Sequence, residues 1–293
     1  MRPKLTLTEY TDPLSGWAWG TEPKLRLLQW RYGHLLRWRQ VMAGIIGEGT
    51  ANRPYPEGAS LAWANVSRHT RMPFAENQRW CETSSVLACR AVKAAGLQGG
   101  KIAARVLRCL REAAFLDGRP LMEVNEICSV LAAVPGLDPR NFREDLQSEV
   151  SAALFREDWA EVRRPSAFVR TLVEIGEGNG IALPCEAGQR YSVPTVIVAG
   201  NGREVTVAGW KPFEDYEEAL GDIFGQSLNP RPDPTPSEAL TYFGTLTAAE
   251  LEMLCGAEAR LPESTARVWG EESVFFAPGH LGMEAARDQG ASR

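Results

Sequence analysis

The sequence lacks closely spaced cysteines. It has six, Cys81, Cys89, Cys109, Cys128, Cys185 and Cys255, and none of them belongs to a Cys-x-x-Cys pair. A disulfide scaffold and a structural zinc module both need cysteines at short, characteristic spacings. Both classes are therefore excluded, and we expect these cysteines to be small packing residues of the hydrophobic core.

Long hydrophobic runs and an excess of positive charge are also missing. No apolar segment approaches the ~20 residues of a membrane-spanning helix, and residues 1–12 contain no apolar core of a secretory signal peptide. The 37 acidic residues outnumber the 32 Lys and Arg, which gives a net charge of −5. These absences predict a cytoplasmic protein whose main partner is neither a membrane nor a nucleic acid.

Histidines are scarce, and motifs for metals or phosphate groups are absent. The three histidines, His34, His69 and His280, are far apart in the sequence. The glycine-rich segment 176–180 lacks the spacing of a phosphate-binding loop and is typical of a turn. We therefore predict no metal site.

What the sequence does contain is a clear pattern near its N-terminus. Residues 4–11 alternate apolar and polar side chains and include Thr and Tyr, which predicts a strand. Glu22-Pro23 begins a helix, because proline is well tolerated in a first helical turn, and Gly33 ends it. Residues 35–46 form a second predicted strand. This order is typical of a βαβ unit with parallel strands.

The middle of the chain has a different pattern. Residues 52–71 contain two prolines and are predicted to be irregular. Helical periodicity then dominates from Phe74 to Val162. The predicted helices begin near Trp80 and Ile102 and continue at 122–134, 141–146 and 151–160, while residues 168–175 fit either a short helix or a strand.

After this helical block the pattern returns to strands. Residues 193–199 and 204–208 are β-branched and flank Gly200-Asn201-Gly202, which predicts a hairpin. An amphipathic helix follows at 212–224. The remaining predicted segments are a proline-rich linker at 229–236 and two short helices at 237–243 and 247–255.

The order of these elements predicts an α/β, thioredoxin-like fold, βαβ…ββα, with a large all-helical insertion and a small C-terminal helical appendage. The predicted units are the first thioredoxin-like half at 1–50, the insertion at 51–165, the second half at 166–227, the linker at 228–236 and the small helical unit at 237–285.

The segment that follows the first predicted strand resembles a known family. It reads Asp12-Pro13-Leu14-Ser15-Gly16-Trp17-Ala18-Trp19-Gly20, and Glu22-Pro23 comes next. This resembles the Asp-Pro-x-Cys-x-x-Cys-Trp turn of the DsbA superfamily, above all in its FrnE-like dithiol oxidoreductase and SpxH-type adapter branches. Val193-Pro194-Thr195 is similar to the loop that holds the family's cis-proline. The resemblance implies that the turn and this loop face each other across a ligand cleft.

The sequence departs from the family at the two reactive positions, where Ser15 and Ala18 replace the cysteines. Dithiol exchange needs a low-pKa thiolate to attack and a second thiol to resolve the mixed disulfide. Neither side chain supplies one, so we predict no Cys-x-x-Cys oxidoreductase activity. Cys81 and Cys89, placed on one predicted helix, are the only conceivable substitutes.

Two functions are compatible with such a turn. In the first, the protein is a redox-inactive member of the family that binds a peptide, a protein or an apolar small molecule, as the adapter branch does. The resemblance places the ligand in a cleft formed by Asp12, Trp17, Ala18, Trp19, Val193 and Pro194. This function needs no cofactor.

In the second function, Ser15 is catalytic. The pattern of Asp12, Ser15, Trp17 and Trp19 is similar to the Asp-x-x-Ser-x-Tyr-x-Trp turn of kappa-class glutathione transferases and 2-hydroxychromene-2-carboxylate isomerases. The resemblance implies that the Ser15 hydroxyl stabilises the thiolate of a bound low-molecular-weight thiol such as glutathione or mycothiol. The structural alternative is that Ser15 only caps the helix that follows it.

Overall fold

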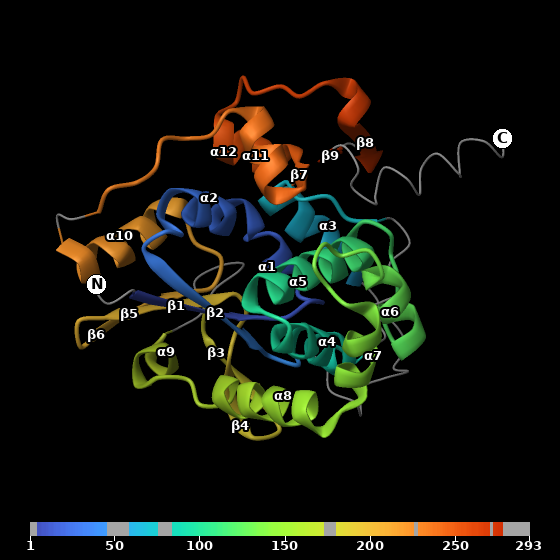
Figure 1. The fold of residues 1–293 in the computed structure, drawn as a ribbon. Helices are drawn as coiled ribbons and strands as arrows, with labels where there is room; N and C mark the ends of the chain where they lie inside the picture. Colours follow the sequence, from blue (N-terminus) through green and yellow to red (C-terminus); the bar gives the residue numbers. More distant parts are fainter. Residues whose placement is uncertain are drawn as a thin grey trace.

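A computed structural model describes residues 5–45, 59–75, 84–172, 180–225, 228–269 and 272–277. Its centre is a four-stranded sheet in the order β2-β1-β5-β6 (Figure 1). The strands are β1 (Leu5–Thr11), β2 (Leu36–Met42), β5 (Thr195–Gly200) and β6 (Arg203–Ala208). β1 is parallel to β2 and antiparallel to β5. The predicted thioredoxin-like arrangement of a βαβ unit and a later hairpin is confirmed.

The β5–β6 hairpin closes as its sequence predicts. Asn201 and Gly202 form the turn with φ values of 54° and 74°. Two consecutive residues with positive φ match the twist of antiparallel strands, and asparagine and glycine adopt this conformation at the lowest steric cost.

Helices cover both faces of the sheet (Figure 1). One face packs against α2 (Glu22–Tyr32) and α10 (Phe213–Phe224) through a cluster that includes Leu7, Leu28 and Leu220. The opposite face packs against the segment around α8 and α9 through Tyr10, Val41 and Ile197. Alternate residues of the strands thus enter two separate cores. This explains why β5, which begins Thr-Val-Ile-Val-Ala, is apolar on both faces.

The insertion is helical in its described residues. Its helices are α3 (Ala59–Thr70), α4 (Val86–Leu97), α5 (Gly100–Phe115), α6 (Val124–Leu131), α7 (Pro139–Gln147), α8 (Glu149–Val162) and α9 (Ala167–Thr171). The prediction of an irregular segment at 52–71 is wrong for α3, because the prolines at 54 and 56 precede a stretch free of proline and glycine. Trp80 and Cys81 lie outside the described residues.

A small hairpin that the sequence analysis did not predict precedes β5. It consists of β3 (Ala182–Cys185) and β4 (Gly188–Tyr191), which pair antiparallel as a separate sheet. The strands are short, and Pro184 interrupts the first, so the local pattern was too weak to indicate pairing.

The C-terminal unit contains the two predicted helices and a sheet that was not predicted. α11 (Pro236–Phe243) and α12 (Ala248–Cys255) each begin with a capping box, Thr235 with Glu238 and Thr247 with Glu250. β7 (Thr245–Thr247), β9 (Glu272–Phe276) and β8 (Ala266–Trp269) form a three-stranded sheet in that order, and a short 3-10 turn (Glu263–Thr265) precedes β8. Residues 278–285 of the predicted unit lie outside the described residues.

The proline-rich segment before α11 is attached to the core rather than suspended between units. Arg31 at the end of α2 donates to both carboxylate oxygens of Asp233, at 2.8 and 3.1 Å. The indole of Trp30 donates to the carbonyl of Pro232 at 2.8 Å. These contacts bring the C-terminal unit against α2, above the sheet in Figure 1. No helix among the described residues is long and apolar enough to cross a membrane.

Candidate functional site

Ser15 lies in the turn after β1 and caps the one-turn helix α1 (Gly16–Trp19). Its Oγ accepts a hydrogen bond from the backbone N–H of Ala18 at 3.2 Å. The residue is 5% exposed. Ser15 is thus the N-cap of α1, and its hydroxyl oxygen has a partner within the turn. The catalytic role of Ser15 stays a prediction.

Asp12 ties the turn to the surrounding chain. Its Oδ1 accepts the N–H of Leu14 at 2.9 Å, and its Oδ2 accepts the N–H of Ile45 at 2.9 Å. The same oxygen also accepts the hydroxyl of Ser85 and the thiol of Cys89, at 2.9 and 3.4 Å. Burial raises the pKa of the Asp12 carboxyl, and these hydrogen bonds oppose that rise.

Asp12, Ala18 and Trp19 have no exposed surface, which corrects their predicted place in the wall of an open cleft. The indole of Trp19 donates to the carbonyl of Pro73 at 3.0 Å and stacks on Phe115 with ring centroids 5.7 Å apart. These partners belong to the insertion, which closes over the turn. The prediction failed because the sequence does not show where an insertion packs.

An aromatic row lies at the exposed side of the turn. It is formed by Trp17 of the turn, His69 of α3 and Trp210, which follows β6. The ring of His69 makes edge contacts with both indoles, at centroid distances of 5.5 Å to Trp17 and 4.5 Å to Trp210. His69 is exposed, and the two tryptophans are half-buried. The indole of Trp210 donates to the carbonyl of Gly20 at 3.0 Å, which fixes the row to the turn. The sequence analysis did not place His69 at this site, because it predicted an irregular segment where α3 lies.

Lys24 contacts the aromatic row at Trp210. Its ammonium is placed over the ring of Trp210 and donates to the carbonyl of Lys211. Burial lowers the pKa of Lys24 to about 7, although Asp215 and Glu214 act in the opposite direction. The amine is therefore partly neutral near physiological pH.

Pro194 follows a cis peptide bond from Val193, as the resemblance implied. Its carbonyl accepts the N–H of Gly209 at 2.9 Å. Thr195 pairs with Tyr10 in the sheet, so Pro194 lies beside the end of β1, where the turn begins. The turn and the proline loop thus share one end of the sheet. That Val193 presents its backbone to a ligand opposite Ser15 stays a prediction.

Four of the five described cysteines, Cys89, Cys109, Cys128 and Cys255, do not have the properties of reactive thiols. Burial raises the pKa of Cys89 well above its ordinary value and raises that of Cys109 to about 12. It also raises the pKa of Cys128, and that of Cys255 to about 11. A thiol must ionise to attack a disulfide, so these side chains stay protonated and unreactive. Cys81, the other conceivable substitute, lies outside the described residues.

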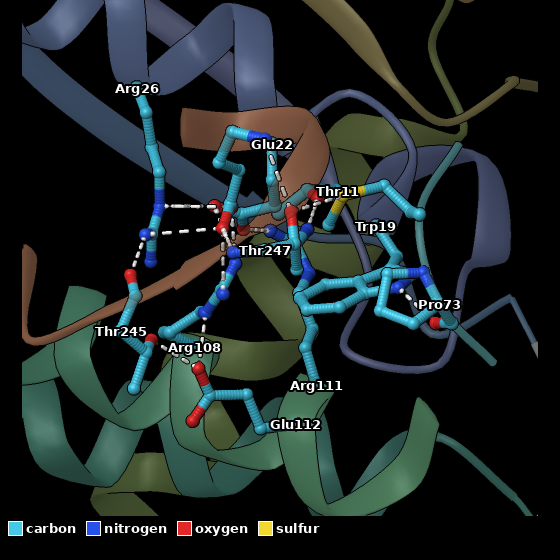
Figure 2. Close-up of polar contacts among 12 residues, drawn as sticks. Thr11, Trp19, Glu22, Arg26, Pro73, Arg108, Arg111, Glu112, Thr245 and Thr247 are labelled. Atoms are coloured by element: carbon cyan, nitrogen blue, oxygen red, sulfur yellow. Dashed lines mark hydrogen bonds and ion pairs between the residues drawn. The ribbon is translucent and has the colours of Figure 1, made fainter. Parts of the chain in front are cut away.

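A buried ion network lies behind the turn and joins three units of the chain (Figure 2). Arg111 of α5 pairs with Glu22, the first residue of α2. Arg108 donates to both oxygens of Glu250, at 2.6 and 3.0 Å, and Arg26 reaches the same carboxylate at 3.2 Å. Burial opposes ionisation of Glu22, but Arg111, Arg108 and Arg26 hold its pKa below the ordinary value.

Groups of acidic or sulfur-bearing side chains that resemble a metal site are not found in the part of the chain that the structure describes. No three His, Cys, Asp or Glu side chains there converge to hold a metal ion.

Comparison with a protein-family model decides the family, since residues 9–162 match the model described as thioredoxin. The chain belongs to the thioredoxin family. It is 28% identical over 261 residues to the ClpXP adapter protein SpxH of Shouchella clausii, covering 85% of this chain and 77% of the relative. It is 27% identical to the SpxH of Bacillus licheniformis, covering 91% of this chain and 86% of the relative.

Solved structures support the same fold. A putative protein disulfide isomerase from Nitrosomonas europaea superposes with a TM-score of 0.61 at 16% identity, covering 77% of this chain and all of that one (100%). The cytosolic disulfide reductase DsbM from Pseudomonas aeruginosa gives 0.53 at 19% identity, covering 74% and 98%. At these identities the likeness concerns the fold alone.

Proposed function

We propose that this thioredoxin-family protein binds a protein partner, as an adapter, and does not catalyse dithiol exchange. The observation that carries the proposal is the turn itself. Ser15 and Ala18 occupy the positions where the family's oxidoreductases have cysteines, and the Ser15 oxygen serves as a helix cap. The protein keeps the family's binding geometry without the groups that the reaction needs.

The aromatic row gives this end of the fold a surface suited to a protein. Tryptophan offers a large contact area at a small cost in side-chain entropy and is enriched among residues that dominate binding energy. The hydrogen bond to Gly20 fixes Trp210 before binding, and Trp17 is half-buried and contacts His69. The relatives named as ClpXP adapter proteins support a protein partner. We propose ClpXP, in the cytoplasm, as the first partner to test.

The decisive experiment compares two variants of the turn. Purified protein is immobilised, and binding of purified ClpXP is measured by surface plasmon resonance. Ser15→Ala should bind as the wild type does, because its hydroxyl only caps α1. Trp17→Ala should weaken binding about tenfold or more, the effect expected of an aromatic anchor at an interface. The proposal fails if Trp17→Ala binds with unchanged affinity.

An insulin-reduction assay and a titration with small thiols complete the test. The wild type should show no turnover, in contrast to a Cys-x-x-Cys relative used as positive control. Calorimetric titration with glutathione or mycothiol should show no binding. Thiol binding that Ser15→Ala abolishes would instead favour the serine-type thiol-dependent isomerase or transferase.

A further inference from the structure

Three arginines line a hollow on the side of the molecule opposite the C-terminal unit. Arg163 and Arg164 follow the end of α8, and Arg170 belongs to α9. Together with the β3–β4 turn at 187–189 they enclose about 510 Å³ of open space. Figure 1 shows α8, α9 and this hairpin beneath the central sheet. We call this hollow the arginine pocket.

The arginine pocket is positively charged, and no carboxylate among the described residues forms an ion pair with its arginines. Within the described ranges, Arg163, Arg164, Arg170 and the neighbouring Arg190 form no ion pair, whereas sixteen pairs join other residues. Arg163 donates to the carbonyls of Ala43, Trp159 and Gly44. Its buried Nε has no hydrogen-bond partner.

The described acidic residues near the arginine pocket form no ion pair with its arginines. Glu161 lines a neighbouring hollow but binds Arg39 and Tyr10. Glu186 is exposed on the hairpin turn and attracts Arg163 only through space. Burial lowers the pKa of Arg163 and that of Arg190, so both cations pay for desolvation without the compensation of an ion pair. The net charge of the whole chain is −5, so this positive cluster is opposite in sign to the protein as a whole.

An exposed aromatic ring lies on α9, the helix that also carries Arg170. Phe168, the second residue of α9, is 56% exposed, and Arg170 follows it by two residues. Arginine and aromatic side chains together are characteristic of protein interfaces, where arginine pairs with acidic groups and the ring supplies apolar contact. A small inorganic anion would use the arginines but not the ring.

From this geometry we propose that the arginine pocket binds an acidic peptide segment of a partner protein, with carboxylates at the arginines and an apolar side chain against Phe168. The inference extends the proposed function, because it assigns the chemistry of one partner segment. It also places that segment near the turn. Arg163 holds Ala43 and Gly44, and the next residue, Ile45, donates to Asp12.

The test uses fluorescence anisotropy with a short labelled peptide of Glu, Leu and Phe residues, and with a matched peptide in which Gln replaces Glu. The acidic peptide should bind the full chain, and its affinity should fall as salt is added, since the pairs are partly exposed to solvent. The double variant Arg164→Glu with Arg170→Glu should lower the affinity about tenfold or more, because attraction becomes repulsion. Phe168→Ala should lower it by a smaller factor.

A matched control separates the pocket from net charge. Arg140→Glu with Arg260→Glu changes the net charge equally at side chains that are 89% and 74% exposed and lie outside the pocket, and it should bind as the wild type does. The inference is overturned by equal loss in both double variants, by equal binding of the Gln peptide, or by binding of inorganic phosphate at the same arginines without peptide binding. Trp17→Ala should leave peptide binding unchanged, so failure here is distinguishable from failure of the proposed function.

Discussion

Glu250 offers the sharpest test of how the C-terminal unit is held. Its side chain has no exposed surface, and its carboxylate meets the guanidinium groups of Arg108 and Arg26. It also accepts the N–H of Thr247 at 2.7 Å, which completes the capping box of α12. In Figure 2 the arginines approach from α2 and α5, so one carboxylate from the C-terminal unit joins both helices.

Glu250→Gln removes the charge and keeps an amide that can still cap α12. The loss therefore comes from two buried arginines that keep their charge and lose a partner. Breaking a buried pair in this way costs about 3–5 kcal/mol of unfolding free energy. Glu22 still neutralises part of this charge, since it lies 3.5 Å from Arg26 and 3.7 Å from Arg108, so we expect the lower end of that range.

The chain supplies its own control for this measurement. Glu238 forms the same capping box with Thr235 on α11, but it is exposed to solvent and pairs with no arginine among the described residues. Urea unfolding of Glu238→Gln should leave the stability nearly unchanged, whereas Glu250→Gln should shift the transition strongly. Hydrogen exchange should show protection lost first in α12. Equal, small losses in the two variants would refute the view that the ion network holds the unit in place.

Three further predictions concern the turn and its surroundings. Gly16→Ala should lower the unfolding free energy by about 1–3 kcal/mol, because an added Cβ would lie 2.1 Å from the Trp63 ring. Gly100→Ala is the control, since nothing lies within 4 Å of its added Cβ, and it should not lower the unfolding free energy. Thermal unfolding of the two variants compares them. Lys24 binds fewer protons in the folded protein than in the unfolded chain, because folding lowers its pKa from 10.5 to about 7. Its destabilising effect on the fold is therefore largest below pH 7 and fades as the pH rises to 10.5. Lys24→Met should therefore increase stability more at pH 6 than at pH 10, and an equal gain at both would contradict that pKa. Cys89→Ala should leave the fast phase of native thiol labelling unchanged, since this thiol is buried and protonated, and fast labelling of Cys89 would show that it is accessible.

The parts of the fold that local patterns determine were predictable from the sequence. β1 and the β5–β6 hairpin follow from β-branched residues and an Asn-Gly turn, and α11 and α12 follow from their caps. β7, β8 and β9 were not predictable, because their pairing joins residues far apart in the chain, such as Leu246 with Phe275. Short strands whose partners are distant give no periodic signal of their own.

In the candidate site, too, features set by a few consecutive residues were predictable, and features set by contacts between distant segments were not. The loss of both cysteines and the cis-proline were accessible from the resemblance, since each is a property of a few consecutive residues. The contact of His69 with Trp17 and Trp210 and the arginine pocket were not, because His69 and Arg170 lie on α3 and α9, whose packing no local pattern shows. The burial of Trp19 was not predictable either, because it results from contacts with the insertion, such as the hydrogen bond to Pro73.

The network around Asp12 explains how the turn keeps its shape with Ser15 and Ala18 at the two reactive positions. In a dithiol enzyme the geometry of this turn positions a thiolate, whereas here Asp12 and Ser15 have structural partners. Asp12 holds the N–H groups of Leu14 and Ile45, and Ser15 caps α1. Replacing the first cysteine by serine costs little, because the hydroxyl accepts the same N–H that a helix start leaves unpaired. The shape of the turn therefore does not depend on a thiol, and the proposed binding function requires this independence.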